Sequence, residues 1–319
     1  MKILVTGSAG FIGFHVAAAL LRDGHQVTGL DNFNDYYKVA LKRDRFKQLT
    51  PQSGFTGVDA DICDATRLDA LCNTEHFDVV CHLAAQAGVR FSLTHPEAYV
   101  KSNLEGFVNV LEACRHAHTP RLVYASSSSV YGGNTKLPFA ESDPVDRPIS
   151  LYAATKKADE LMAFTYSHLF GLETVGLRFF TVYGPWGRPD MAMWSFTEAM
   201  LAGRSIPVFN HGRMRRDFTF VDDIAGGVTA ALVRPMPERA SLFNLGNHQA
   251  ENLLDMIRII GQTLGVEPRM EMLPMQPGEV EATYADIARA RESLGFEPRI
   301  SIATGIPRFV KWYKEYHRA

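Results

Sequence analysis

The sequence Thr6-Gly7-Ser8-Ala9-Gly10-Phe11-Ile12-Gly13 directly follows a short apolar run, Ile3–Val5, and leads into a helical pattern that starts at Phe14. Glycine is needed where a turn is tight, where backbone approaches a pyrophosphate, and where a helix packs on a strand. The N-terminus of the next helix offers free N–H groups and a positive dipole end to phosphates. A G-x-x-G-x-x-G spacing between strand and helix therefore predicts a dinucleotide-binding turn.

The end of the second predicted strand, Gln26–Leu30, identifies the dinucleotide. Asp31 and Asn32 follow it directly. An acidic residue at this place can hold both hydroxyls of the adenosine ribose and repels a 2′-phosphate, so NAD is favoured over NADP. The alternative for Asp31 is a helix-capping role in a turn. Asp61 and Ile62, after a third candidate strand, are expected either to meet the adenine or to form a turn.

Short apolar runs alternate with amphipathic stretches through the first half of the chain. The runs suit a parallel sheet buried on both faces, and the alternation predicts a doubly wound α/β fold. The predicted strands are Ile3–Val5, Gln26–Leu30, Val79–Leu83, Leu122–Ala125 and Thr174–Arg178, and the clearest helices are Pro96–Ala117 and Ser150–Phe170.

The composition of the sequence changes after Phe180, where Gly and Pro become frequent and the predicted helices and strands become shorter. We therefore expect an NAD-binding domain over residues 1–180 and a smaller, mixed α/β domain over residues 181–319. The stretch Phe218–Arg234 is apolar and helical enough to return to the first domain, so a return segment is predicted near residues 218–245.

The composition is that of an ordinary globular enzyme, with 46% hydrophobic and 21% charged residues and a net charge of -2. This near-neutral balance gives no electrostatic reason to expect a nucleic acid or an anionic membrane as partner. The longest apolar stretches, such as Val16–Leu21, are too short to span a bilayer. The first residues run directly into a strand without a basic leader, so a soluble, cytoplasmic protein is expected.

Cysteine and histidine spacing predicts no metal site. The four cysteines contain no C-x-x-C pair, which favours reduced thiols in a cytoplasmic protein. His116 and His118 are the closest histidine pair, and two residues apart on a helix face different ways.

Tyr152 and Lys156 lie four residues apart on a predicted helix, so both side chains project from one face. An ammonium beside a phenol favours the phenolate, which can act as a base near neutral pH. Ser127 lies in the run Ser126–Ser129 at the end of a predicted strand, where open α/β sheets bind ligands. Its hydroxyl is expected to hydrogen-bond the reacting oxygen. Taken alone, each motif also fits a surface pair or a flexible polar loop.

Together these residues resemble the extended short-chain dehydrogenases/reductases that modify nucleotide sugars. The shared motifs are the glycine turn, Ser126–Gly132, Tyr152–Lys156 and Arg216–Asp223. Within that family the chain is most similar to the UDP-glucuronate 4-epimerases. That similarity rests on LDNFNDYY (30–37), AAQAGVR (84–90) and FFTVYGPWGRPDM (179–191). The resemblance runs from Lys2 to the C-terminal helix.

The resemblance implies a Rossmann-type sheet with NAD and a UDP-sugar substrate. In the implied reaction Tyr152, with Lys156 and Ser127, removes the proton from the sugar O4 while the C4 hydride passes to NAD, which leaves a 4-keto sugar. The positions that correspond to the cofactor site are Gly7, Gly10, Phe11, Ile12, Gly13, Asp31, Asn32, Asp61, Ile62, Leu83, Ala84, Ala85, Asn103, Tyr152 and Lys156.

Ser128 and Ser129 bear on the fate of that keto sugar. The family's 4,6-dehydratases carry an Asp-Glu pair at these positions, and its UDP-glucuronate decarboxylases carry a Glu at the position of Ser129; neither acid is present here. Dehydration needs both a base and an acid, so epimerisation at C4 is expected. The alternatives are epimerisation of UDP-glucose or UDP-N-acetylglucosamine, UDP-glucuronate decarboxylation, and a non-catalytic nucleotide-sugar or NAD sensor.

A glucuronate substrate requires an anchored carboxylate, because its 4-keto form is a β-keto acid that readily loses carbon dioxide. Thr181 and Arg188 are the candidates, helped by Ser128 and Ser129, since an arginine can bind a carboxylate bidentately. An ordinary loop salt bridge is the alternative for Arg188.

The remaining substrate contacts are implied by the resemblance. Arg216 is expected to face the UDP diphosphate, with Arg90 as a second phosphate or carboxylate ligand, and Val208 and Phe209 to pack on the uracil. The sequence departs from the family at Met275–Glu279, where an arginine is common. Gln276 is expected to supply a neutral hydrogen bond there, and Glu279 to reach the uridine ribose.

The two long predicted helices, Pro96–Ala117 and Ser150–Phe170, carry apolar residues on more than one face. In the family such a pair forms a four-helix dimer interface, so a homodimer is expected by analogy.

Overall fold

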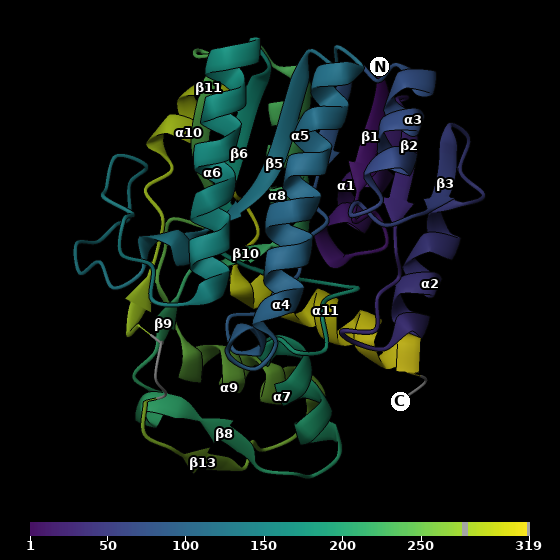
Figure 1. Cartoon of the computed structure of the whole chain (residues 1–319). Helices are drawn as coiled ribbons and strands as arrows, with labels where there is room; N and C mark the ends of the chain where they lie inside the picture. Colours follow the sequence, from purple (N-terminus) through teal and green to yellow (C-terminus); the bar gives the residue numbers. More distant parts are fainter. Residues whose placement is uncertain (276–279, 318–319) are drawn as a thin grey trace.

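The computed structural model describes residues 1–275 and 280–317 (Figure 1). In this part of the chain one parallel sheet has the order β11-β6-β5-β4-β1-β2-β3, so the chain changes direction across the sheet between β1 and β4. The predicted doubly wound α/β fold is confirmed. The strands are β1 (Lys2–Thr6), β2 (Gln26–Asp31), β3 (Phe55–Asp59), β4 (Val79–His82), β5 (Arg121–Ser127), β6 (Glu173–Phe179) and β11 (Ala240–Leu245).

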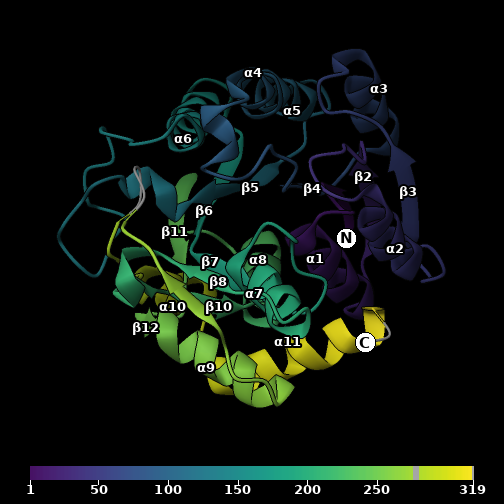
Figure 2. The same ribbon diagram turned by 90° about the horizontal axis from the view of Figure 1, so that it is seen from below.

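The sheet is buried on both faces because side chains alternate in direction along each strand. In β1, Ile3 and Val5 belong to one hydrophobic core, whereas Leu4 belongs to the core on the opposite face. Helices α1 (Phe11–Arg22) and α8 (Val221–Val233) pack together on the first face, and a second group of helices covers the other (Figure 2). The second group is α3 (Ala65–Glu75), α5 (Gly106–His116) and α6 (Leu151–Phe170).

Helix α1 spans Phe11–Arg22 and begins three residues earlier than the sequence pattern predicts. Gly10 is its N-cap, and the amide of Phe14 already donates to the carbonyl oxygen of Gly10 at 3.0 Å. The prediction was wrong because Phe11 and Ile12 look like part of a loop in sequence. In the fold they form the first turn of the helix, which brings its free N–H groups next to the glycines.

The predicted helix Pro96–Ala117 is helical from Pro96 to His116 but changes its winding. It starts as α4 (Pro96–Tyr99), continues as a π-helical segment (Val100–Glu105) and ends as α5. A π-helical turn is rare and has no simple periodic signature in sequence. The second long helix, α6, follows its prediction closely. The Ser150 hydroxyl caps it by accepting from the amide of Ala153 at 3.1 Å, and Gly171 ends it in the left-handed region.

Residues of the second half build the lower part of the molecule in Figure 1, although α8 (Val221–Val233) and β11 return to the large sheet. The other helices of the second half are α7 (Ala192–Leu201), α9 (Leu253–Leu264), α10 (Ala288–Leu294) and α11 (Ile302–His317). Helix α2 (Val39–Leu49) belongs to the first half. The short strands are β7 (Thr181–Tyr183), β8 (Ile206–Val208), β9 (Arg215–Arg216), β10 (Phe218–Phe220), β12 (Glu251–Asn252), β13 (Met270–Met272) and β14 (Ala282–Thr283).

Across the described ranges, none of the helices combines the length and the apolar character that a membrane crossing demands.

Candidate active site

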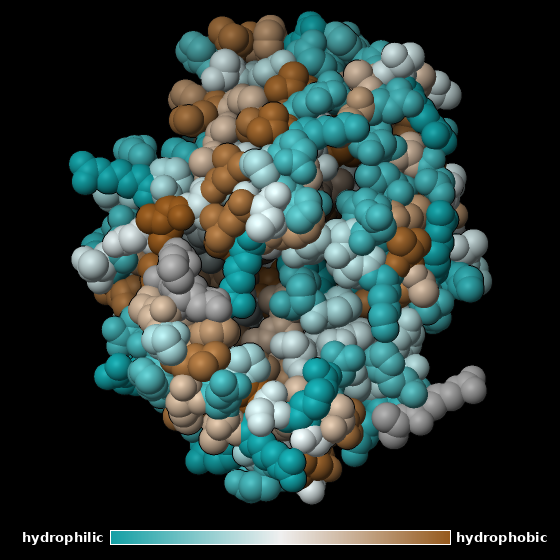
Figure 3. Space-filling view, turned by 60° about the horizontal axis from the view of Figure 1, so that its bottom comes forward, coloured by the Kyte–Doolittle hydropathy of each residue, from teal (hydrophilic) through white to brown (hydrophobic). Residues whose placement is uncertain are grey.

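A cleft of about 1300 Å³, counted out to its open mouth, lies at the carboxyl ends of the parallel strands. Figure 3 shows the hollow from below, between the sheet domain and the lower part of the molecule. This is where open α/β sheets bind ligands, since helix N-termini and loops converge there. Its lining includes the glycine turn at Gly7 as well as Tyr152 and Arg188, so a single cleft joins the predicted cofactor turn to the predicted catalytic and substrate residues.

The glycine turn forms one wall of the cleft through Gly7, Gly10 and Gly13. Gly7 has a φ of +73°, and a Cβ there would lie 2.7 Å from the backbone nitrogen of Ala84. A Cβ on Gly13 would collide with the carbonyl oxygen of Gly7. No other residue type fits these positions, so the turn can lie close against the β4 loop. The turn therefore has the shape that a pyrophosphate requires.

Asp31 lies at the end of β2 and lines the cleft. Its Oδ2 accepts from the amide of Ala9 at 3.0 Å, and its Oδ1 accepts from the amide of Phe33 at 2.8 Å. Burial raises the pKa of Asp31, while these two hydrogen bonds act in the opposite direction. The carboxylate thus ties the glycine turn to the loop after β2. It also remains at the surface of the cleft, where it could accept from two ribose hydroxyls.

Thirteen of the fifteen positions predicted for the cofactor line this cleft, and Asp61 and Asn103 do not. Asp61 Oδ2 accepts from the side chain of Asn32 at 2.9 Å and so orients a residue that does line the cleft. Asn103 is buried and bridges two elements. Its amide nitrogen donates to the Gln86 carbonyl oxygen at 3.1 Å and to Thr155 Oγ1 at 3.0 Å.

Tyr152, Lys156 and Ser127 meet in the same cleft. The Lys156 ammonium is buried and donates to the Ala125 carbonyl oxygen and to Asp159 Oδ2, both at 3.0 Å. Ser127 Oγ accepts from the amide and from the hydroxyl of Ser129, at 3.2 and 2.9 Å. Both of its accepted bonds come from protein groups, so its own proton can point at a ligand. The arrangement can therefore take a proton from a hydroxyl and hydrogen-bond the same oxygen.

Arg188 also lines the cleft, and it forms a two-point ion pair with Asp190, with distances of 3.0 and 2.6 Å. The Tyr36 hydroxyl donates to the same Asp190 carboxylate at 3.1 Å. Burial and the Asp190 charge raise the pKa of Tyr36 to about 12, so this phenol stays a donor at neutral pH. Arg188 thus forms the loop ion pair that was the alternative reading, and because it also lines the cleft, its role as a carboxylate anchor stays a prediction.

The other predicted substrate residues for which the structure gives a position do not line the cleft. The Arg90 guanidinium lies 5.1 Å from the centre of the Phe209 ring, which joins the loop after β4 to the segment after β8. Arg216 donates to the carbonyl oxygens of Arg215 and Glu281, at 2.9 and 3.1 Å. Ser128 and Ser129 begin η3 (Ser128–Tyr131), directly after Ser127. Thr181 begins β7, and Val208 ends β8, where its side chain is fully buried. The predictions for Gln276 and Glu279 fall outside the described residues.

Sequence reasoning missed the side chains that α2 and the loop before it bring to the cleft. Tyr37 and Lys42 line it, and the Lys42 ammonium donates to the Asn34 carbonyl oxygen at 2.8 Å. Arg45 is fully buried and donates to Ala9 O at 3.0 Å and to Trp186 O at 2.7 Å. Two cations three residues apart on a helix share a face. Such a pair of cations on the buried face of α2 was the feature of the sequence that could have indicated these site residues.

Comparisons with known proteins agree with this geometry. The model of the NAD dependent epimerase/dehydratase family matches residues 3–246. UDP-glucuronate 4-epimerase 4 of Arabidopsis thaliana is 49% identical over 333 residues, covering 99% of this chain and 76% of that protein. A probable UDP-glucuronate 4-epimerase of Rhizobium meliloti is 43% identical, covering 100% and 98%. The structure of UDP-glucuronic acid 4-epimerase from Bacillus cereus with UDP-glucuronic acid and NAD has a TM-score of 0.93 at 35% identity, covering 99% and 100%.

Proposed function

The chain belongs to the NAD-dependent epimerase/dehydratase family, and we propose that it is a UDP-glucuronate 4-epimerase that interconverts UDP-glucuronate and UDP-galacturonate. The observation that carries this proposal is the neutral turn Ser127–Ser129 beside Tyr152 and Lys156. Such a turn supplies hydroxyls for a proton transfer at C4 but no acid for an elimination. Relatives that span the whole chain at 43–49% identity and carry this name support the same reaction.

The cofactor is held by the glycine turn, by Asp31 and by the loop after β4, all of which fit a dinucleotide. NAD, when bound, supplies the acceptor and donor of the C4 hydride, and it is regenerated in each turnover. Tyr152 takes the proton from the sugar O4 and returns it when the opposite epimer forms. The Lys156 ammonium favours the phenolate, and the Ser127 hydroxyl donates to the sugar oxygen.

The substrate carboxylate has to be held where the bond to C5 cannot align with the keto group. Arg188 is the cation of the cleft best suited to this, because its planar guanidinium is held by Asp190 and its side chain is only 23% exposed. Ser128, Ser129 and Thr181 add hydroxyl donors at the border of the site. Arg216 and Arg90 bind the diphosphate, and Phe209 with Val208 packs on the uracil.

The proposal is tested by incubating the purified protein with UDP-glucuronate or UDP-glucose, without added NAD. The nucleotide sugars are separated by liquid chromatography before mass spectrometry, because epimers have equal mass. We expect UDP-galacturonate from the first substrate and little turnover of the second. The Tyr152→Phe variant should lose at least about 10²-fold in kcat, the usual contribution of a positioned acid–base group, while keeping its bound NAD. Carbon dioxide with a UDP-pentose, or preferred turnover of UDP-glucose, would reject the proposal.

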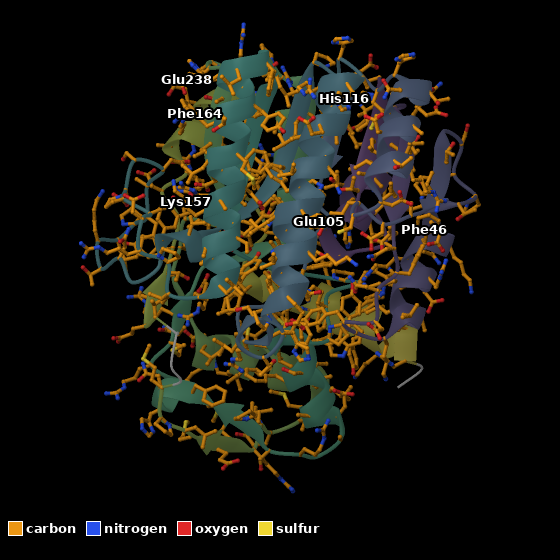
Figure 4. All side chains as sticks on the ribbon, in the orientation of Figure 1. Phe46, Glu105, His116, Lys157, Phe164 and Glu238 are labelled. Carbon is orange, nitrogen blue, oxygen red and sulfur yellow. The ribbon has the colours of Figure 1, made fainter. Side chains whose placement is uncertain are left out.

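A homodimer through α5 and α6 completes the proposal. Leu161, Phe164 and Leu169 are all more than half exposed on α6, and apolar side chains of this size seldom gather on a monomer's surface. Phe164 and Lys157 on α6 lie on the same side of the molecule as Glu105, which precedes α5 (Figure 4). In Figure 3 hydrophobic side chains gather on the upper part of this face.

A further inference from the structure

Lys156 has a buried acidic partner on its own helix. The ammonium lies 3.0 Å from Asp159 Oδ2, and the two side chains are 2% and 1% exposed. Residues three apart on a helix share a face. The spacing along α6 alone therefore brings the two side chains together, and the ion pair between them connects α6 to no other element. The ammonium has the Ala125 carbonyl oxygen as its second acceptor. The lysine therefore sits between β5 and a carboxylate, on the floor of the cleft.

The Asp159 carboxylate is incompletely satisfied. Its Oδ1 is buried and has no hydrogen-bond partner among the residues that the structure describes. An unpaired buried oxygen on a charged group is costly, so a purely structural pair would be expected to satisfy it. Burial raises the pKa of Asp159 to about 6, against the opposing attraction of Lys156. The carboxyl group thus changes its charge close to physiological pH.

The other charges around the pair are already engaged. Glu160, the next residue, accepts from Arg178 at 2.8 Å and from the Ser126 hydroxyl at 2.7 Å. On the sheet side, burial raises the pKa of Tyr124, to which Asp159 and Glu160 contribute, and burial lowers the pKa of His82 with the help of Lys156. Both rings are therefore neutral near pH 7. Asp159 is the group next to Lys156 whose charge can change in this range.

We propose that Asp159 is a positioning residue for the epimerisation, which holds the Lys156 ammonium on the floor of the cleft and offsets its charge toward Tyr152. The inference rests on the proposed function. A lysine that is partly neutralised favours the phenolate less than a free cation does. At lower pH Asp159 takes up a proton and no longer offsets the charge of Lys156. The full positive charge of Lys156 then acts on Tyr152. The two groups therefore titrate as a coupled system.

The experiment compares wild-type protein with Asp159→Asn and Asp159→Ser, both of which remove the charge. The acid limb of the kcat profile should move to lower pH by about 1 unit, the lower end of the effect of a nearby charge. KM should stay within about twofold of the wild-type value, a factor that corresponds to less than about 0.5 kcal/mol. Asp255→Asn is the matched control, because Asp255 forms an i,i+3 pair with Arg258 at 2.6 Å that is exposed and outside the cleft.

A second measurement needs no turnover. The ultraviolet absorbance of phenolate is titrated in the NAD-bound protein, and the curve of Tyr152→Phe is subtracted to isolate Tyr152. The midpoint should fall in Asp159→Asn by the same amount as the kinetic limb. Unshifted midpoints in folded, NAD-binding variants would overturn the role of Asp159.

If the midpoint falls in Asp159→Asn but the wild-type protein does not turn over UDP-glucuronate, the proposed function alone is rejected. If the variants do not fold, carboxyl-carbon NMR of the aspartate-labelled wild-type protein still tests whether Asp159 and Tyr152 titrate together. One resonance must titrate together with the phenolate signal, and independent titration of all aspartates would exclude the coupling.

Discussion

At the scale of single residues, the loop after β4 depends on the buried, neutral imidazole ring of His82. It ends β4 beside the glycine turn, and its Nδ1 lies 2.8 Å from the hydroxyl oxygen of Thr6. The same hydroxyl accepts from the amide of Ala84, at the start of the loop that faces Gly7. A charged imidazole in this place would have no room for water and would face the Lys156 ammonium.

The stability of the protein should therefore fall in mild acid. Burial, with a contribution from Lys156, lowers the pKa of His82 to about 3, below the value of 6.5 for an unperturbed histidine. The unfolded chain then binds this proton more readily, so the stabilisation is complete above 6.5 and is lost as the pH falls toward 3. At about pH 5 the loss is about 2 kcal/mol, which urea unfolding measures.

Replacing His82 by Gln should remove this part of the pH dependence, whatever the change does to stability at neutral pH. His168→Gln, at an exposed position near the end of α6, is the control and should leave the slope as it is. Equal slopes in wild type and His82→Gln would show that another group unfolds the protein in acid.

At the scale of elements, a buried ion pair joins α6 to the sheet next to the catalytic turn. Arg178 of β6 contacts both carboxylate oxygens of Glu160 on α6, at 2.8 and 2.9 Å, and both side chains are almost fully buried. Ser126 of β5 donates to the same carboxylate, and the Arg178 guanidinium also donates to the Tyr131 hydroxyl at 3.0 Å. Three elements that carry site residues thus meet at one carboxylate.

Glu160→Gln should reduce the free energy of unfolding by about 3–5 kcal/mol, because it leaves the Arg178 charge buried without its counter-charge. Denaturant unfolding measures this loss. Glu173→Gln is a suitable control, since Glu173 pairs with Arg121 at 3.0 Å at a partly exposed site and should cost about 1 kcal/mol or less. A similar small loss in both variants would mean that water reaches Arg178.

The elements themselves were largely predictable, and the exceptions have physical causes. The predicted strands of the large sheet all form, because continuous apolar runs have few other stable places in an α/β fold. The π-helical turn Val100–Glu105 was not predictable, since it depends on packing against neighbouring segments. Neither were the partners of Arg45 of α2, which come from the glycine turn and from residues 186 and 187, whereas Lys42 donates to Asn34.

At the scale of the whole molecule, the proposed dimer makes a simple prediction. Phe164 is 62% exposed at the centre of the apolar face of α6. Phe164→Asp places a charge in the proposed interface, so the protein should change from dimer to monomer in sedimentation experiments. Val233→Asp, at an exposed apolar position at the end of α8, is the control and should keep the wild-type mass. A wild-type monomer, or a dimer unaffected by Phe164→Asp, would contradict the interface.

The sequence by itself determined the glycine turn, the acidic residue at the end of β2, the Tyr152–Lys156 pair and the alternation of strands and helices. These features depend on interactions within a few residues, such as backbone conformation, helical spacing and side-chain alternation. Only the tertiary structure decided that Arg45 joins the glycine turn to the loop at Trp186, and that Arg188 meets Tyr36 through Asp190. Arg45 and Trp186 are 141 positions apart along the chain, and Tyr36 and Asp190 are 154 apart, so close packing alone brings these groups together. The burial of Asp159 against Lys156 was decided in the same way: helical spacing puts the two on one face, but the sheet beneath removes them from water.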